Sequence, residues 1–460
     1  MCHMENITQV LQQDISKRRV ILTVAIVSLG FFMTTLDASV VNVSLPVIQR
    51  YFHESLAMTE WVITSYLLVI SSVLLSFGRL SDLKGHKKLI LIGFSVFTLS
   101  SVCCGLSVSL YMLIIARTFQ ALGGAMIMST GPALIMNVVP AKNRGKALSS
   151  TAVSLSIALC AGPVIGGLFT SVLGWQSIFF LNVPIGVIAL ILAAVNMPTD
   201  HIKEHVPFDV LGSMMIFTAL VLIVFPLDMT GKSGINSVLH YAMLAVGILM
   251  TIGFILWEIK SPSPLLKMSL FKNRAFTTGN LALFLAYIMQ YGLAFFLPYF
   301  LEKHWMLSAA AAGELMFPLT AAMICITPIS GMLADRFESR LICAAGMLIT
   351  AFSVFMLCGL SAKETIIYWV IVSVIAGIGS GLFQTPNMKQ IMDSVSSEDR
   401  GMASAMRSTL VSIGDVLGVA ISGAIYTSSA YTYRAVFITL GFITLLAAMV
   451  SFAKGRTKAQ

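Results

Sequence analysis

The chain has 460 residues, of which 57% are hydrophobic and only 11% are charged. Soluble globular chains carry about 25% charged residues, so this composition excludes an ordinary soluble domain and predicts an all-α membrane protein. The net charge of +9 does not indicate a nucleic-acid partner, because the basic residues gather in short segments between apolar runs. The seven cysteines show neither a disulfide framework nor a metal-ligand spacing, and no cofactor is expected.

Apolar runs long enough to cross a membrane follow one another along the whole chain. The first begins after Lys17, Arg18 and Arg19 and is longer than the apolar part of a signal peptide, so we expect it to remain as a helix. Fourteen runs begin near residues 20, 60, 88, 110, 146, 177, 209, 238, 275, 308, 340, 365, 402 and 434. Few connectors between them leave room for a folded soluble domain.

Lysine and arginine residues are divided unequally between the two sides that this count produces. With the N-terminus inside, 23 of the 29 basic residues fall in cytoplasmic segments, five fall outside, and Arg117 lies within a span. The positive-inside rule then predicts that both termini and the loop around Lys84 are cytoplasmic, while Lys232 and Lys363 are extracellular. An omitted span would reverse the later loops and remove this bias, which supports the count of fourteen.

Two short motifs recur at a nearly constant offset. Gly78-x-Leu80-x-Asp82 returns 253 residues later as Gly331-x-Leu333-x-Asp335, and Arg144-Gly145-x-Ala147 returns at an offset of 256 as Arg400-Gly401-x-Ala403. We therefore expect a cytoplasmic segment (1–19), a six-helix bundle (20–197), a linker with two additional transmembrane helices (198–274), a second six-helix bundle (275–453) and a cytoplasmic tail (454–460). Equivalent halves with a site between them are typical of transporters.

Four motifs carry a resemblance to a known family. They are Leu36-Asp37-Ala38-Ser39-Val40-Val41-Asn42-Val43 in the first span, the segment Gly78-Arg79-Leu80-Ser81-Asp82-Leu83-Lys84-Gly85, Arg117-Thr118-Phe119-Gln120 in the fourth span, and Ala161-Gly162-Pro163-Val164-Ile165-Gly166-Gly167 in the fifth. Over nearly its whole length the chain resembles the fourteen-span drug:proton antiporters of the major facilitator superfamily. The chain departs from the family at Leu83 and His86, where arginine is usual, and at Glu338, which replaces a glycine.

The resemblance implies a fold and a function. The fold would be the major facilitator fold, with two six-helix bundles and a two-helix insert. The function would be proton-coupled efflux of small lipophilic or cationic drugs by alternating access, by a monomer in a bacterial cytoplasmic membrane. The expected partners are a small-molecule substrate, protons and membrane lipids.

The loop that follows the second span has a conformational interpretation. Gly78 would permit close helix approach, Gly85 would permit a tight turn, and Asp82 could accept hydrogen bonds from a neighbouring helix N-terminus. We expect the loop to stabilise the outward-open state; the alternative is plain positive-inside charge.

The glycine-rich motif of the fifth span suggests a contact surface. Pro163 after Gly162 loosens a backbone hydrogen bond, while Gly166 and Gly167 offer a smooth helix face. Ordinary helix packing would explain most of this pattern. The functional interpretation adds that this face closes the two halves together.

Asp37 and Arg117 are the leading candidates for proton coupling. Ionisable groups in a hydrocarbon layer are costly unless they are paired or hydrated. Counted from the outer ends of their spans, the two residues lie at depths of roughly 14 and 10 Å, so they can form a pair. Burial favours the protonated form of Asp37 and Arg117 favours its carboxylate, a balance that suits a proton carrier. A static structural ion pair is the alternative.

Further polar and aromatic residues are candidates for substrate binding. Asp415 lies mid-span in the thirteenth run and should face a cavity, whereas Glu314 could be a shallow interfacial residue. Gln290 corresponds to Asp37 at the offset of 253, which makes the halves electrostatically unequal. The candidate substrate-binding set is Asp415, Glu314, Gln290, Tyr66, Tyr287 and Tyr291; Phe32 and Phe295 are further aromatic candidates.

Other function classes fit the sequence less well. The order His201-Ile202-Lys203-Glu204-His205 is that of an inverted zinc-protease motif, but it stands in a short polar loop, so neither a metal site nor an enzyme is expected. A channel usually needs a pore loop or an oligomeric ring, which the two-half repeat disfavours. A proton-linked carrier of one metabolite, lipid or siderophore remains the alternative.

Overall fold

The computed structural model describes residues 2–140, 144–197, 209–228, 237–261, 268–359, 366–396, 400–428 and 433–453. Over these ranges the regular structure is helical, which confirms the all-α prediction. Thirteen helices in the described part of the chain are long and apolar enough to cross a membrane. The remaining predicted span is α9 (Val210–Asp228), whose apolar stretch Leu211–Pro226 is shorter. The exact count of fourteen is therefore not confirmed.

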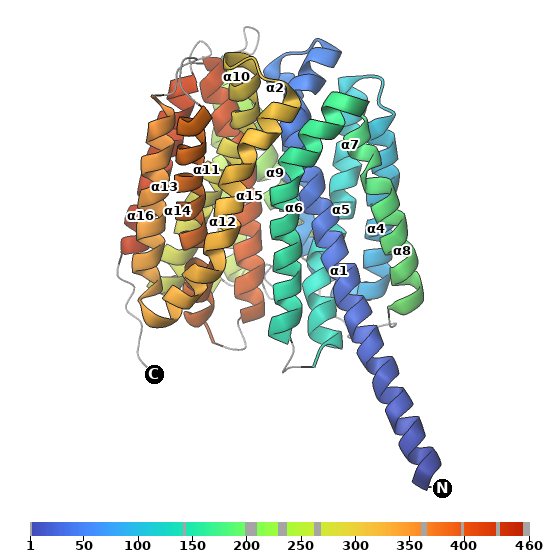
Figure 1. Cartoon of the computed structure of the whole chain (residues 1–460). Coiled ribbons are helices and arrows are strands. Elements are labelled where there is room, and N and C mark those ends of the chain that lie inside the picture. Colours follow the sequence, from blue (N-terminus) through green and yellow to red (C-terminus); the bar gives the residue numbers. More distant parts are fainter. Residues whose placement is uncertain are drawn as a thin grey trace.

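The first half of the chain forms one group of packed helices, coloured blue to green in Figure 1. Short α2 leads into α3 and short α7 leads into α8, so each of these pairs corresponds to one predicted span. The helices are α1 (Cys2–Phe52), α2 (Leu56–Thr59), α3 (Trp61–Lys84), α4 (His86–Gly105), α5 (Leu110–Val138), α6 (Arg144–Leu173), α7 (Ser177–Phe180) and α8 (Asn182–Asn196).

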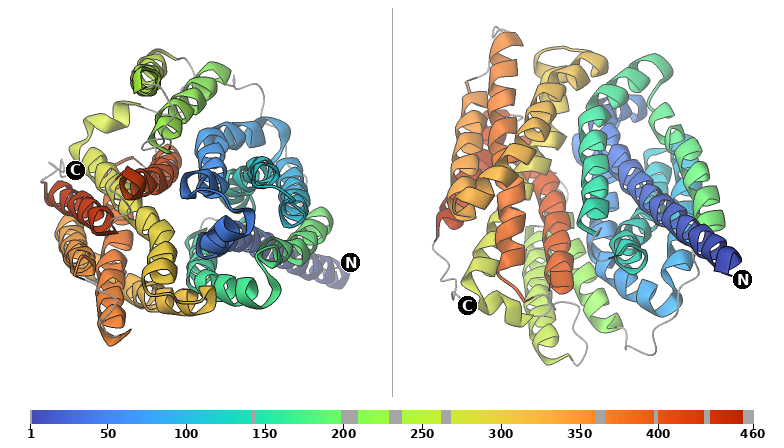
Figure 2. Two further views of the ribbon diagram at one scale, coloured as in Figure 1. Left: turned by 90° about the horizontal axis from the view of Figure 1, so that it is seen from above. Right: turned by 60° about the horizontal axis from the view of Figure 1, so that its bottom comes forward.

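The last part of the chain forms a second group on the opposite side of the molecule, coloured yellow to red. Its elements are the short 3-10 helix η2 (Met268–Lys272), α11 (Arg274–His304), α12 (Ala309–Arg336), α13 (Ser339–Leu357), α14 (Ile366–Asp393), α15 (Arg400–Ser428) and α16 (Tyr433–Phe452). The view from above in Figure 2 shows the two groups side by side.

Between the two groups in sequence lie α9 and α10 (Ser237–Lys260), which pack as a hairpin. Asp209 ties them together, because its carboxylate accepts hydrogen bonds from the backbone N–H of Gly212 (2.7 Å) and from Trp257 Nε1 (2.9 Å). The hairpin contacts α3 and α15 through α9, and it lies at the edge of the bundle in Figure 2. Much of α10 exposes apolar side chains, including Leu249 and Ile259, as expected of a lipid-facing helix.

The two groups touch at one end of the bundle. The start of α1 projects from the other end, which we call the basal end (Figure 1); the opposite end is the distal end. At the distal end Arg50 Nη2 of α1 lies 2.6 Å from Glu302 Oε2 of α11. The side chain of Glu302 is 0% exposed and that of Arg50 is 60% exposed, so this ion pair joins a buried carboxylate to a partly hydrated guanidinium.

The fifth-span glycines lie where α6 crosses two other helices. A Cβ at Gly166 would stand 3.0 Å from the Val40 backbone of α1, and one at Gly167 would collide with the backbone at Ala309 of α12. Facing them, a Cβ at Gly313 of α12 would collide with the carbonyl oxygen of Pro163. The smooth face predicted from the sequence is therefore a real packing surface, because only hydrogen fits between these backbones.

The two glycines of the loop motif behave differently. Gly85 has φ +92° between α3 and α4, so the predicted tight turn needs glycine there. At Gly78 the predicted close helix approach is wrong for this conformation: the nearest atom to an added Cβ is Ser129 Cβ at 3.9 Å. The space beside Gly78 is open because the residue opposite it, Ser129, has a small side chain. The side chain of Asp82 lies outside the described residues.

The aspartate of the second copy of the loop motif forms an ion pair with a lysine. Asp335, in the last turn of α12, lies 2.6 Å from Lys389 Nζ of α14, and the same ammonium donates to the carbonyl oxygen of Ala334 (2.8 Å). Both partners are partly exposed, so this ion pair fastens two helix ends near the surface and contributes little to the stability of the fold.

Candidate transport site

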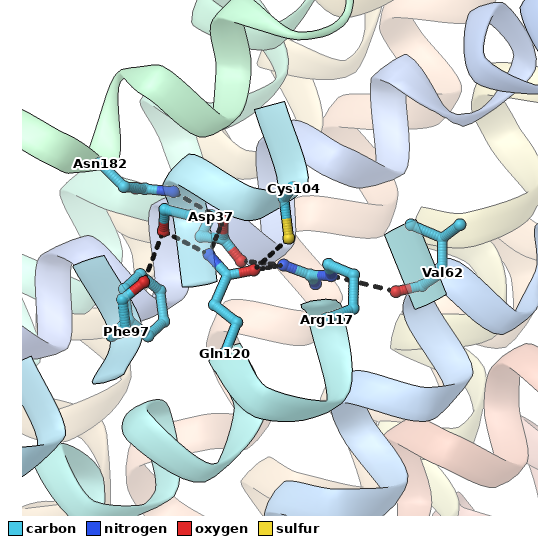
Figure 3. A network of polar contacts seen from close by, with 8 residues as sticks. Asp37, Val62, Phe97, Cys104, Arg117, Gln120 and Asn182 are labelled. Atoms are coloured by element: carbon cyan, nitrogen blue, oxygen red, sulfur yellow. Dashed lines mark hydrogen bonds and ion pairs between the residues drawn. The ribbon is translucent and has the colours of Figure 1, made fainter. Parts of the chain in front are cut away.

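Asp37 of α1 lies at the centre of a buried polar network (Figure 3). Arg117 Nη1 is 2.5 Å from its Oδ2. Gln120 Nε2 and Asn182 Nδ2 donate to its Oδ1 at 3.0 and 2.7 Å. Asp37 is 2% exposed and Arg117 is 0% exposed. The pair predicted from matching depths therefore exists, and the carboxylate has three donors drawn from two further helices.

Two donors of the network, Arg117 and Gln120, make further hydrogen bonds. Arg117 and Gln120 are three residues apart on α5 and so share one helix face, which allows Arg117 Nη1 to donate to Gln120 Oε1 at 2.7 Å. Gln120 Nε2 also donates to Ser101 Oγ of α4 at 2.8 Å. The Nε of Arg117 donates to the carbonyl oxygen of Val62 at 3.1 Å. These bonds fix the guanidinium and the amide before any ligand arrives.

Tyr66 of α3 completes the shell around Arg117. Its ring centroid lies 4.0 Å from Arg117 Cζ, with the ring of Phe179 at 5.8 Å. Aromatic faces stabilise a desolvated guanidinium. Tyr66, predicted as a substrate-binding residue, is thus a partner of the ion pair, although it also lies within electrostatic range of Tyr291.

The network has a clear physical consequence. Opposite charges attract strongly at low dielectric, and a half-broken buried pair is costly. Asp37 and Arg117 are both shut away from solvent in this conformation. The static and the proton-carrying interpretations of the pair both stay predictions.

A second carboxylate is buried in the other half with much less support. Asp415 of α15 is 6% exposed, and its Oδ1 accepts no hydrogen bond within the described part of the chain. Tyr291 of α11 lies within electrostatic range of it, as does Tyr287 one turn earlier. A buried carboxylate with a spare lone pair favours a proton, a cation or a hydrogen-bond donor as its next partner.

Arg407 is a residue whose position the sequence interpretation missed. The positive-inside count in the sequence includes Arg407 among its 23 cytoplasmic charges, but the residue lies within α15, seven residues after the start of that helix at Arg400. Arg407 is half-buried and is close enough to hydrogen-bond with the hydroxyl of Tyr287. Its spacing of eight residues from Asp415 within one apolar run is a signal that could have found it.

The remaining candidates are scattered. Gln290 is half-buried and its Nε2 lies 3.5 Å from Met323 Sδ, a weak contact that leaves the amide available. Glu314 is exposed on α12 and takes part in none of the ion pairs among the described residues; its substrate-binding and interfacial interpretations both stay predictions. Phe295 is 0% exposed and packs against Tyr299, so it is a core residue.

No group of three or more histidine, cysteine or acidic side chains that could hold a metal occurs among the residues that were placed. The motif from His201 to His205 lies outside the described residues, so it stays a sequence observation.

The sequence profile of the Major Facilitator Superfamily matches residues 27–270 and 280–459. The chain belongs to this superfamily. Among its relatives, the riboflavin transporter RibZ of Clostridioides difficile is 33% identical over 413 residues, covering 89% of this chain and 88% of that protein. The tetracenomycin C resistance and export protein of Streptomyces glaucescens is 29% identical over 408 residues, covering 88% and 76%. The multidrug resistance protein Stp of Mycobacterium tuberculosis is 30% identical over 409 residues, covering 89% and 76%.

A solved structure shares the fold. A bacterial homologue of the human lysosomal transporter Spinster, in an inward-facing and unoccupied conformation, superposes with a TM-score of 0.66 at 17% identity, covering 95% of this chain and 96% of that one. The molecule is accordingly a multi-pass membrane protein of the transporter class, with the superfamily's helical fold.

Proposed function

We propose that this protein is a fourteen-span drug:proton antiporter that exports small lipophilic or cationic molecules across a bacterial cytoplasmic membrane. Relatives named for multidrug resistance and antibiotic export support the direction of transport and the substrate class. The observation that carries the proposal is a buried carboxylate in each half: Asp37, fully paired with Arg117, and Asp415, with one unsatisfied oxygen.

In this scheme Asp37 carries the proton. A proton that enters from outside neutralises the carboxylate, which weakens its pairing with Arg117 and leads to substrate release. Deprotonation toward the cytoplasm then restores the pair and permits the next substrate to bind. The cycle is exchange by competition for one charge. Both termini are cytoplasmic in this scheme, so the distal end faces outside and the Arg50–Glu302 contact closes the outer entrance.

Asp415 has a separate role in the proposal. A carboxylate in a medium that screens little attracts cations strongly, so it binds the charged part of the substrate. Asp415→Asn should weaken efflux of cationic drugs, dications most, and spare neutral ones. An equal loss of efflux for cationic and neutral drugs would assign Asp415 to coupling or folding instead.

The decisive experiment compares Asp37→Asn with Asp37→Glu in proteoliposomes under an imposed pH difference. With one proton exchanged per substrate, a difference of about one pH unit supports about tenfold accumulation. Wild type should reach this ratio and Asp37→Glu part of it. Asp37→Asn keeps the size of the side chain but cannot titrate, so any substrate that it still binds should equilibrate across the membrane without accumulation. If Asp37→Asn still accumulates substrate, the proton travels through another group, and Asp415 or Glu314 becomes the leading candidate.

A second candidate function is a proton-linked carrier of one metabolite. The riboflavin transporter among the relatives, 33% identical over 413 residues, favours it. Counterflow with a lipophilic cation separates the two: an exporter of many drugs exchanges the cation, and a single-metabolite carrier does not.

A further inference from the structure

Two opposite charges stand on the same helix of the transport site. Arg407 and Asp415 are eight residues apart on α15, which places them about 12 Å apart along the helix axis. The two side chains do not pair with each other, and no ion pair among the described residues includes either one. Each charged side chain is therefore available to a partner other than the opposite charge on its own helix.

Two tyrosines of α11 lie near these charges. Tyr287 and Tyr291 lie one turn apart on α11, which packs tightly on α15: a Cβ at Gly414 would stand 3.0 Å from the carbonyl oxygen of Phe284 and 3.1 Å from Tyr287 Cβ. Tyr287 contacts Arg407, and both tyrosines lie within electrostatic range of Asp415. Tyr287 thus lies near both the guanidinium and the carboxylate, and Tyr291 lies near the carboxylate.

The side chains of Arg407 and Asp415 both have unused hydrogen-bonding capacity. Nε of Arg407 is buried and has no acceptor in the described part of the protein, and Oδ1 of Asp415 is buried without a donor. Native proteins leave few such groups unsatisfied, and a ligand is one reason for an exception. One end offers a charged donor and the other a charged acceptor.

An arginine near a helix end often only extends its side chain to the membrane surface. Arg407 differs from this case in two respects. It lies roughly 10 Å along the axis from the start of α15 at Arg400, and its guanidinium turns to the Tyr287 hydroxyl with Nε buried.

We propose that Arg407 is a specificity-determining residue that binds an anionic or strongly hydrogen-bond-accepting group of the substrate. The preferred substrate is then an amphoteric aromatic molecule, with its acidic or carbonyl-rich edge on Arg407, its rings against Tyr287 and Tyr291, and its basic edge on Asp415. This inference rests on the proposed transport function and narrows its substrate class from simple lipophilic cations.

The test is equilibrium binding to the full-length protein in lipid nanodiscs, followed by fluorescence anisotropy without a pH gradient. The probes are a rhodamine with a free carboxylate and the methyl ester of the same dye, which share rings and cationic end and differ in the acidic group. Wild type should bind the acid at least tenfold more tightly than the ester, as a charge-assisted hydrogen bond supports. Arg407→Gln should weaken binding of the acid by roughly tenfold or more and change binding of the ester less than twofold. Arg407→Lys should be intermediate, because lysine keeps the charge and loses the planar fork.

Arg340→Gln is the matched control, because Arg340 pairs with Glu338 at the start of α13. This variant should leave the binding of both dyes unchanged. Tyr287→Phe removes the hydroxyl and keeps the ring, so the preference for the acid should persist, which tests the idea even where Arg407→Gln does not fold. The proposal is overturned if the wild type does not prefer the acid, if Arg407→Gln weakens the binding of both dyes equally, or if Tyr287→Phe abolishes the preference for the acid. Asp37→Asn should keep the preference, so failure of proton coupling and failure of this inference are distinguishable.

Discussion

Asp37 and Asp415 are both buried aspartates on transmembrane helices, yet their surroundings differ. The carboxylate of Asp37 has Arg117, Gln120 and Asn182 as donors, whereas Oδ1 of Asp415 has none among the described residues. A charge with three donors is stabilised in place, and a charge without them changes its protonation or binds a ligand. At the scale of single residues, these two aspartates therefore differ: the carboxylate of Asp37 has three donors, and Oδ1 of Asp415 has none among the described residues.

The network around Asp37 should be sensitive to its neutral members. Asn182→Ala removes the 2.7 Å bond to Oδ1 at a site that is 1% exposed, and a hydrogen bond to a charged group contributes about 1.5–3 kcal/mol. We expect a lower temperature of thermal unfolding in detergent and slower transport. Asn196→Ala is the control, because Asn196 bonds only within its own helix, to the carbonyl oxygen of Leu192. An Asn182 variant as stable as the wild type would show that the network contributes little.

At the scale of helices, α6 packs against helices of both halves. One of its faces meets α1 at Gly162 and Gly166, and another meets α12 at Gly167. Close backbone approach of this kind gains dispersion contacts over a long crossing. The same crossing must separate if the distal end opens during transport, so small residues allow contact without interlocking side chains.

A single methyl group should disturb this crossing. At Gly313 of α12 an added Cβ would collide with the Pro163 carbonyl oxygen, so Gly313→Ala should destabilise the closed distal end by about 1–3 kcal/mol, as overpacking does. Gly78→Ala is the matched control, because its Cβ would have 3.9 Å to Ser129 and alanine favours a helix by up to about 1 kcal/mol. Thermal unfolding measures both. Equal stability of the two variants would contradict the tight α6–α12 contact, and lost transport with normal stability in Gly78→Ala would show that Gly78 is needed in another conformation.

At the scale of the whole molecule, a polar contact joins the two halves at the distal end. The ion pair of Arg50 and Glu302 joins α1 to α11 beside the glycine crossing. Since Arg50 is 60% exposed, solvent screens the attraction, and we assign it no more than about 1 kcal/mol. A weak contact of this size suits an entrance that opens in every cycle.

Neutralising the buried partner should favour an open distal end. Glu302→Gln removes the pair, and a loss of about 1 kcal/mol raises the open population roughly fivefold. Spin labels at exposed Tyr51 and Met306 would report longer distances in pulsed electron resonance. Reversing both charges with Arg50→Glu and Glu302→Arg together should restore the wild-type distances. Glu338→Gln, which breaks the exposed pair with Arg340, is the control; distances unchanged by Glu302→Gln would mean that the glycine crossing alone closes this end.

The orientation in the membrane is a separate whole-molecule prediction. With the distal end outside, a cysteine at exposed Ser55 in a cysteine-free background should react with an impermeant thiol reagent added to intact cells. A cysteine at exposed Lys84 should react only after the membrane is opened. The reverse pattern would overturn the positive-inside assignment.

The sequence by itself determined that this protein crosses a membrane many times as helices, and it found the Asp37–Arg117 pair. Hydropathy and charge are local properties, and a rise of about 1.5 Å per residue turns position along a helix into depth. Matching depths were enough for one ion pair, and the repeat located equivalent motifs at the ends of α3 and α12. The boundaries of the two halves and the roles of the site residues stay predictions.

Only the tertiary structure decided which neighbours complete the site. It brought Gln120 and Asn182 to Asp37, stacked Tyr66 on Arg117, and showed open space at Gly78. It also turned Arg407 from a loop charge into a partner of Tyr287. Depth along a helix can be counted from the sequence, but the direction in which a side chain points depends on how helices distant in the chain rotate and pack against one another. That rotation is fixed by the summed contacts of the whole bundle, which no single motif contains.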